Sequence, residues 1–235
     1  ALSQIGPGVA WYDLDHDGAE ELIVGSGKGG HVAVFRNVAG RLVSTSGQGP
    51  LAVADFTSIL GYSDRGRTQL LAGVATWQFR SDSAMMAQPA AIGITVNGTS
   101  LSTATESSAG SHSSSTGPLA LGDYDEDGHL DLFVGSRAIP QRYPVAPSSG
   151  LFRNVGGSFV FDTLNADVLR DVGMVSSAMF ADINGDGHAD LVLAREWSSL
   201  LLLLNDGHGK LTPASESWGL AKLTSRWNGV AAGDL

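Results

Sequence analysis

Short apolar runs alternate with turns rich in Gly and Asp along the whole chain, and this pattern predicts a protein made of β-strands. Three stretches share one arrangement, in which an apolar strand leads into a loop of alternating acidic residues and a second apolar strand follows directly. These stretches are 8–25, 118–135 and 177–194. The longest leucine run, 200–204, is far shorter than the ~20 apolar residues of a membrane-spanning helix. We therefore expect no membrane insertion.

A second motif follows each acidic loop. It is an apolar run that ends in an Asn and then a Gly, at Asn37–Gly40, Asn154–Gly157 and Asn205–Gly209. Asn and Gly between apolar runs mark a tight turn with positive φ. Each repeat therefore supplies about four strands: two around the acidic loop and two around the Asn-Gly turn.

Two weaker copies extend the series. Residues 51–56 begin like a repeat at Asp55, but a longer insertion precedes Gln69, which takes the place of the last loop residue. Residues 229–235 match a repeat start and reach Asp234. The leading Asp of the repeats thus recurs every ~40–70 residues, which is typical of β-propeller blades of four strands.

The predicted fold is all-β, a single partial β-propeller domain over 1–235. We expect four blades at about 8–47, 50–104, 117–162 and 174–215, with the start of a fifth at 227–235, as part of a longer propeller. Because residues 99–116 are mostly Ser and Thr, they are predicted to form a flexible surface loop between the second and third blades.

The acidic loops have the form D-x-[DN]-x-D-G-x-x-[DE], which predicts calcium binding. Positions 1, 3 and 5 direct oxygen ligands to one side of a tight curve, Gly at position 6 permits the bend, the carbonyl of position 7 turns inward, and an acid at position 9 closes the shell. We name the loops by repeat. The expected ligands are Asp13, Asp15, Asp17, Ala19 and Glu21 of loop 1; Asp123, Asp125, Asp127, His129 and Asp131 of loop 3; and Asp182, Asn184, Asp186, His188 and Asp190 of loop 4.

The residues of these loops argue against an EF-hand and against metals other than calcium. An EF-hand needs a Glu at position 12 and flanking helices, but that position is Val24, Val134 or Leu193 within a strand-like run. Magnesium favours a smaller octahedral site with more water, and the chain lacks Cys and an organised His cluster for softer metals. Among the three predicted Ca²⁺ sites, loop 4 should bind most weakly because Asn184 replaces a carboxylate. The second repeat should bind no metal, and His16 at position 4 of loop 1 should point outward.

Charge and composition narrow the function classes. The formal net charge is −10, which argues against a nucleic-acid partner. The chain has no cysteine, so disulfides and thiol catalysis are excluded. The phosphate-loop and serine-hydrolase motifs are absent, and the paired carboxylates all have metal-loop spacing. The tryptophans could line a sugar site, although packing between blades is the favoured interpretation; they are Trp11, Trp77, Trp197, Trp218 and Trp227.

The repeats resemble FG-GAP or VCBS repeats, the calcium-loop blades also found in integrin α-chains. The spellings at 8–18, Gly-Val-Ala-Trp-Tyr-Asp-Leu-Asp-His-Asp-Gly, and at 35–38, Phe-Arg-Asn-Val, are most similar to the cartilage acidic protein family and its bacterial relatives. The resemblance implies a seven-bladed, extracellular or periplasmic propeller used for adhesion or ligand binding. It also implies metal-ligand roles for the acidic and amide residues at positions 1, 3, 5 and 9 of the three loops.

Two functions remain from the sequence. The first is a secreted, non-catalytic adhesion or ligand-binding scaffold whose Ca²⁺ ions clamp the blades, with an extracellular protein or glycan as partner. The second is a carbohydrate-active propeller, either a lectin or a polysaccharide lyase. A lyase should have a cluster of basic residues, and the 14 Lys and Arg residues show none in the sequence, so the scaffold is favoured over an enzyme.

Overall fold

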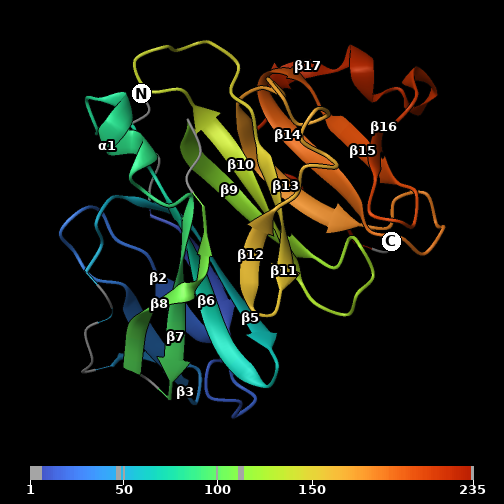
Figure 1. The fold of residues 1–235 in the computed structure, drawn as a ribbon. Helices are drawn as coiled ribbons and strands as arrows, with labels where there is room; N and C mark the ends of the chain where they lie inside the picture. The colour runs from blue at the N-terminus through green and yellow to red at the C-terminus, as the bar shows by residue number, and fades with distance from the viewer. Residues whose placement is uncertain (1–6, 46–48, 50, 99, 111–113, 234–235) are drawn as a thin grey trace. The chain divides into compact units, whose positions relative to one another are not determined.

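The computed structural model of the protein describes residues 7–45, 49, 51–98, 100–110 and 114–233. These residues form four antiparallel sheets, each built on four strands paired in chain order, and one of the sheets has a fifth strand (Figure 1). The all-β fold class is therefore confirmed, and the four-stranded sheets agree with a partial propeller. The chain divides into two compact units, Ala1–Ser113 and Ser114–Leu235, and each is described by itself.

The first unit holds two sheets. The strands of its first sheet are β1 (Val9–Tyr12), β2 (Glu21–Val24), β3 (Ala33–Val38) and β4 (Arg41–Ser44). Those of its second sheet are β5 (Phe56–Asp64), β6 (Arg67–Val74), β7 (Ala91–Asn97) and β8 (Ser100–Ala109), with the short helix α1 (Asp82–Met86) between β6 and β7. Apolar side chains from both sheets, including Ile23, Phe56, Leu70 and Ile94, form one buried cluster.

The second unit repeats this plan. Its first sheet has strands β9 (Ser115–Gly122), β10 (Asp131–Ala138), β11 (Gly150–Val155) and β12 (Ser158–Phe161). Its second sheet has strands β13 (Val175–Ala181), β14 (Asp190–Ser199), β15 (Leu201–Asn205) and β16 (Leu211–Pro213). Phe133, Leu151, Leu191 and Leu203 belong to its buried core. Each sheet buries one face against its neighbour, which is how a four-stranded blade becomes stable.

An aromatic ring on a glycine marks the close approach of neighbouring sheets in both units. A Cβ atom at Gly61 of β5 would lie 2.3 Å from the ring of Tyr12, and one at Gly122 of β9 would lie 2.5 Å from the ring of Phe180. Both distances are far below van der Waals contact. The two glycines are therefore required because each neighbouring ring occupies the space of a side chain.

The Ser- and Thr-rich segment is not the loop that composition predicts. Residues Ser100–Ala109 form strand β8, which pairs with β7, and β9 begins at Ser115; residues 99 and 111–113 of the predicted loop lie outside the described residues. Thr favours strands because it is β-branched. Leu101 packs on the first unit's core. Pairing with a buried strand therefore outweighs the polar composition.

The second repeat also differs from its predicted alignment. Asp55 precedes the first strand of its sheet instead of following it, and its Oδ1 accepts a hydrogen bond of 2.9 Å from the backbone N–H of Lys28. Strands β5 and β6 are joined by the two-residue turn Arg65-Gly66, in which both residues have positive φ. This turn, at the end of β5, occupies the place of an acidic loop.

The segment after β16 contains two short 3₁₀ turns, Glu216–Trp218 and Leu220–Lys222, and strand β17 (Thr224–Arg226), which pairs with β14. Residues 227–233 form no strand, and Asp234 and Leu235, which complete the predicted start of a fifth blade, lie outside the described residues. Within the described part of the chain, every helix is too short or too polar to cross a membrane.

Candidate metal centres

The first aspartate of each acidic loop shapes the loop in the same way. Its two carboxylate oxygens accept hydrogen bonds from the backbone N–H groups of positions 5 and 6. The distances are 3.1 and 3.0 Å for Asp13, 3.1 and 3.0 Å for Asp123, and 3.1 and 2.9 Å for Asp182. Position 6 is Gly18, Gly128 or Gly187, with φ between 86° and 91°. Gly is needed here because this left-handed backbone strains other residues.

The aspartate at position 5 closes the turn. Its Oδ1 accepts a hydrogen bond of 2.9 Å from the backbone N–H of position 7 in all three loops, which is Ala19, His129 or His188. This contact fixes the backbone of position 7. The carbonyl of that residue as a metal ligand remains a prediction.

The acid at position 9 lies at the start of the second strand and is buried in every loop. Asp131 accepts hydrogen bonds from the backbone N–H groups of Tyr124 at 3.3 Å and Asn154 at 2.8 Å. Asp190 likewise accepts from Ile183 at 3.0 Å and Asn205 at 2.8 Å. These two acids therefore hold each loop against its sheet's third strand, whether or not they also bind an ion.

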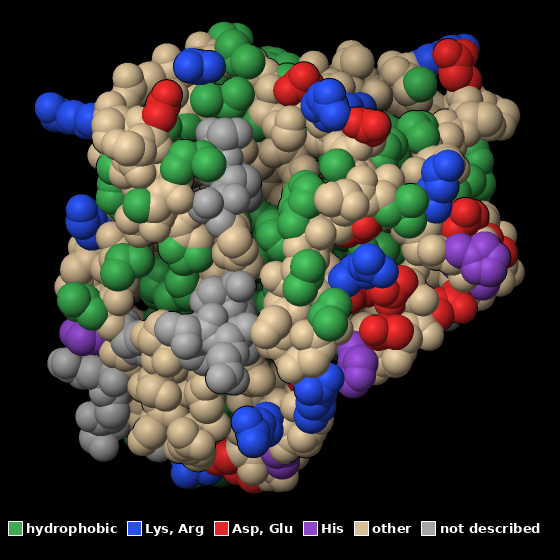
Figure 2. Space-filling model, viewed as in Figure 1, with side chains coloured by type: hydrophobic (Ala, Val, Ile, Leu, Met, Phe, Trp, Pro, Cys, Tyr) green, Lys and Arg blue, Asp and Glu red, His purple; other side chains and the backbone are tan. Residues whose placement is uncertain are grey.

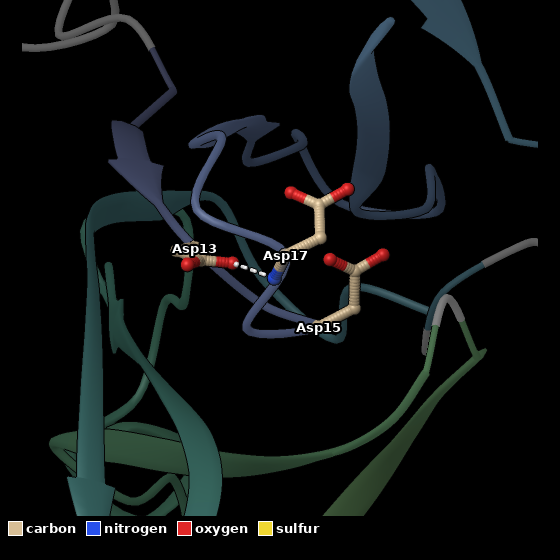
Figure 3. A group of neighbouring side chains, drawn as sticks. All are labelled: Asp13, Asp15 and Asp17. Atoms are coloured by element: carbon tan, nitrogen blue, oxygen red, sulfur yellow. Dashed lines mark hydrogen bonds between the residues drawn. The ribbon is translucent and has the colours of Figure 1, made fainter.

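Two of the loops bring three carboxylates together. One oxygen from each of Asp13, Asp15 and Asp17 lies within 4.8 Å of the others, and so do those of Asp123, Asp125 and Asp127. Figure 3 shows the Asp15 and Asp17 carboxylates side by side, with Asp13 bonded to the backbone nitrogen of Asp17. Either aspartate triad could hold a metal ion.

Buried oxygens without partners show that the residues of loops 1 and 3 fit a cation. Asp15 Oδ1 and Glu21 Oε1 of loop 1, and Asp125 Oδ1 of loop 3, are buried and have no hydrogen-bond partner among the described residues. Glu21 as a whole is only 1 % exposed. A buried carboxylate oxygen without a partner destabilises a fold. A cation bound by these oxygens would remove that penalty.

An arginine from the third strand partly neutralises these two loops. Arg36 Nη2 lies 2.5 Å from Asp15 Oδ2 and 3.5 Å from Asp17 Oδ2, and Arg153 Nη1 lies 3.9 Å from Asp125 Oδ2. The corresponding residue beside loop 4 is Leu204. Loops 1 and 3 thus combine five carboxylates with one arginine, whereas loop 4 has three carboxylates and no arginine, so the arginine narrows the difference in formal charge to −4 against −3.

Burial and the nearby negative charges raise the pKa of several loop carboxyl groups. Burial, with a smaller effect from Asp15 and Asp17, raises the pKa of Glu21. Burial and then the charge of Asp127 raise the pKa of Asp125. Burial raises the pKa of Asp131 to about 7 although two backbone N–H groups oppose the shift. A cation would favour the ionised form of all three.

The polar side chains of loop 4 form more hydrogen bonds with each other than those of loops 1 and 3. Asn184 Nδ2 donates to Asp186 Oδ2 at 2.7 Å, and Asn184 Oδ1 accepts from the backbone N–H of Asp186 at 3.0 Å. The N–H of His188 and the amide of Asn184 lower the pKa of Asp186. Since Asn184 already bonds to Asp186, this loop needs a cation less than the other two.

Position 4 carries a role that the spacing did not predict. His16 and Glu126 both have positive φ, of 59° and 61°, and Gly185 takes the same conformation in loop 4. His16 Nε2 makes a hydrogen bond of 2.8 Å with Thr68 Oγ1, and Glu126 contacts His188 Nδ1. His16 is exposed, as predicted, and its ring also reaches the neighbouring sheet, which the spacing did not predict. The Glu126 carboxylate raises the pKa of His188.

The Asn-Gly hairpins also support the loops. Asn205 Nδ2 donates to the carbonyl of Tyr124, in loop 3, at 2.7 Å and to that of Ala189, in loop 4, at 3.1 Å. Asn154 Nδ2 donates to the carbonyl of Leu130 at 3.2 Å. The sequence already pointed to this Asn, because it recurs at one place in each repeat, but only the fold shows that it reaches an acidic loop.

Figure 2 shows acidic and histidine side chains lying close together on the right-hand part of the surface.

The tryptophans are less buried than the sequence suggested. Packing between blades is wrong for Trp11 and Trp197, whose exposed fractions are 52 % and 64 %, and Trp218 is also exposed. Trp77 and Trp227 are half-buried. Of the five, Trp197 is the most exposed.

Comparisons with known proteins support a repeat architecture for part of the chain. Residues 182–235 match the model of the FG-GAP-like repeat family. No curated protein matches the sequence. Among solved structures, a lectin of Agrocybe aegerita described as recognising non-reducing terminal N-acetylglucosamine is 16% identical with a TM-score of 0.49, over 86% of this chain and 50% of that chain. The chain thus spans about half the length of that lectin, and its last quarter is similar to FG-GAP-like repeats.

Proposed function

We propose that this protein is a calcium-binding repeat module that acts as a non-catalytic scaffold for adhesion or ligand binding. Ca²⁺ would be held by the acidic loops and would clamp the first connection of three sheets. The proposal rests most directly on the buried, unpartnered oxygens of Asp15, Glu21 and Asp125.

Calcium suits the donor set better than other cations. The side-chain donors are all oxygens, and Ca²⁺ takes six to eight oxygen ligands in a flexible arrangement. In loop 1 the ligands would be Asp13, Asp15, Asp17 and Glu21, with the Ala19 carbonyl. In loop 3 they would be Asp123, Asp125, Asp127 and Asp131, with the His129 carbonyl. In loop 4 they would be Asp182, Asn184, Asp186 and Asp190, with the His188 carbonyl.

The proposed cellular location agrees with the calcium affinity expected of such loops. Extracellular modules bind Ca²⁺ with Kd of ~10⁻⁴–10⁻³ M, well suited to the millimolar calcium outside cells. An extracellular or periplasmic location, an extracellular protein or glycan as partner, and kinship with the cartilage acidic protein family are parts of this proposal. The match of 182–235 to FG-GAP-like repeats supports a repeat scaffold.

Calorimetry on chelator-treated protein tests the metal site directly. Titration with CaCl₂ should show uptake at the acidic loops, and MgCl₂ should bind more weakly. The double variant Asp15→Asn, Asp125→Asn should lose the binding of loops 1 and 3. Thermal melting of the same samples detects binding that releases little heat.

Asp206→Asn is the matched control. Asp206 is also an aspartate in a hairpin turn of the second unit, and its Oδ1 accepts from the backbone N–H groups of His208 and Lys210, but it lies outside the acidic loops. This variant should bind Ca²⁺ like the parent protein. If CaCl₂ released no heat and left the melting temperature unchanged, the proposal would be wrong.

A further inference from the structure

A hollow of about 570 Å³ lies in the second unit, at the ends of its sheets away from the acidic loops. Three segments line it: the connection between β10 and β11, the connection between β12 and β13, and the last residues of β14. β14 starts at Asp190 of loop 4 and reaches the hollow at Arg195, five residues later, which corresponds to about 17 Å along a strand. The hollow is therefore separate from the candidate metal centres. Its volume falls within the usual range of small-molecule sites.

Trp197 is turned into this hollow by a break in the strand. The pairing of β14 with β17 shifts register between Glu196 and Ser198, so Trp197 is the extra residue of a β-bulge. Its φ is 57°, a conformation that costs energy for a residue with a side chain. Bulges and such strained residues are found where a side chain has been redirected for a function.

A second aromatic residue lies beside Trp197. Its Nε1–H donates to the hydroxyl of Tyr143 at 3.2 Å, which fixes the two side chains relative to each other. Trp197 is 64 % exposed and Tyr143 is 53 % exposed. A pair of exposed, mutually held aromatic side chains offers apolar surface to a ligand at little cost in side-chain entropy.

Most of the charged groups near the hollow already make contacts within the protein. Glu196, which is buried, accepts from Arg137 Nη2 at 2.5 Å and from Arg226 Nε at 3.3 Å. Arg195 uses all three of its nitrogens, on the carbonyl of Val172 and on the carbonyl and hydroxyl of Ser199. Three of the five N–H groups of Arg195 are therefore already engaged within the protein, which limits its use for an anion.

The remaining polar groups in the hollow suit hydroxyl groups. The Asp171 side chain is exposed, and its carboxylate makes only a long contact of 3.4 Å with Ser148 Oγ among the described residues. Ser198 also lines the hollow. The three arginines named above (Arg137, Arg195 and Arg226) outnumber the two acids, Glu196 and Asp171. The net charge around the hollow is therefore positive, which disfavours a cationic ligand. A neutral ring with one apolar face and a rim of hydroxyls fits this combination.

We propose that this hollow is a binding site for a neutral carbohydrate, of one or two sugar rings. Trp197 and Tyr143 would contact the C–H face of a ring, and Asp171 and Ser198 would hydrogen-bond its hydroxyls. This inference goes beyond the proposed calcium scaffold, because none of these residues belongs to an acidic loop.

Binding should be measured on the calcium-loaded protein with a defined panel of probes. The panel contains immobilised glycans that end in a neutral hexose or N-acetylhexosamine, in a uronic acid or in a sialic acid, and tetramethylammonium in solution. We expect binding to neutral termini and at least tenfold weaker binding of the charged probes. Binding of no probe, or preferential binding of the acidic glycans or of tetramethylammonium, would overturn the proposal.

Trp197→Gly is the decisive variant, because Gly accepts the positive φ and so preserves the bulge. It should weaken binding of the neutral glycan at least tenfold while the melting temperature and Ca²⁺ uptake remain those of the parent protein. Trp218→Gly is the control, since Trp218 is another exposed tryptophan of this unit that does not line the hollow, and it should change binding less than twofold. Asp171→Asn should weaken binding three- to tenfold. Neutral-glycan binding that survives Trp197→Gly would also refute the site.

Discussion

The first and second sheets of the chain make the same connection in two different ways. Strands β1 and β2 are joined by an eight-residue segment rich in carboxylates, whereas β5 and β6 are joined by the two-residue turn Arg65-Gly66. Both sheets nevertheless have four strands in the same order and share one core. A short turn is therefore sufficient to build such a sheet.

The difference shows what the acidic loop adds. Loop 1 concentrates five carboxylates and leaves buried oxygens of Asp15 and Glu21 without partners, which a plain turn avoids. A costly element that folding does not require points to a separate purpose, and cation binding is the one that its donors support. The second sheet thus serves as an internal control for the other three.

Calcium removal should produce the largest effect. If each loop binds with a Kd of about 10⁻⁴ M, 1 mM Ca²⁺ stabilises the folded state by about 1.4 kcal/mol per site. Hydrogen exchange with and without a chelator measures this locally. Amides of β1, β2, β9, β10, β13 and β14 should lose protection without calcium, and those around Arg65-Gly66 should not. Equal loss of protection in all four sheets would contradict the proposed difference between the acidic loops and the Arg65-Gly66 turn.

Two glycines provide a matched test of the connection itself. Gly128 of loop 3 and Gly66 of the β5–β6 turn have φ of 86° and 73°, and an added Cβ would meet no atom within 4 Å at either site. In chelator, Gly128→Ala and Gly66→Ala should each cost about 1–2 kcal/mol through backbone strain alone. With calcium present, denaturant titration should show a larger loss for Gly128→Ala only. An identical loss in both conditions would mean that loop 3 does not depend on the ion.

The arginine beside loops 1 and 3 should tune calcium affinity. A unit charge about 5 Å from a doubly charged ion in a water-like environment is worth about 1.7 kcal/mol, or roughly fifteenfold in Kd. Arg153→Leu reproduces the residue found beside loop 4 and should tighten Ca²⁺ binding at loop 3 by about that factor. Leu204→Arg should weaken binding at loop 4 similarly, as measured by calorimetry. An unchanged Kd in both variants would exclude this electrostatic role.

The pH dependence of the metal-free protein should show a smaller effect. Burial raises the pKa of Asp131 to about 7, above the value of about 3.9 in an unfolded chain. Between these values the folded state binds more protons, so its stability should fall as the pH rises from about 4 to 7. In chelator, the melting temperature should be a few degrees lower at pH 7.5 than at pH 5.5. Asp131→Asn should remove part of this difference, and calcium should oppose it by favouring the ionised carboxylate.

Local sequence patterns predicted most strands and turns well, but they predicted poorly which distant residues contact each other. The alternation of apolar runs with Asp- and Gly-rich turns marked the strands around loops 1, 3 and 4, because each turn is specified by residues next to it. In the second repeat the matching Asp55 misled the alignment, since it binds the backbone of Lys28 in the connection between β2 and β3. The strand over Ser100–Ala109 was missed because pairing with β7, not its own composition, determines its structure.

The sequence by itself determined the acidic loops, the glycine bends and the Asn-Gly hairpins, since these depend on the spacing of neighbouring residues. Only the tertiary structure decided which oxygens are buried without partners, that Arg36 and Arg153 lie over two loops, and that His16 reaches the next sheet. It also placed Trp197 in a bulge beside Tyr143, which lies 54 residues earlier in the chain. The physical reason is that burial and charge pairing arise between strands distant in sequence, and no local pattern records them.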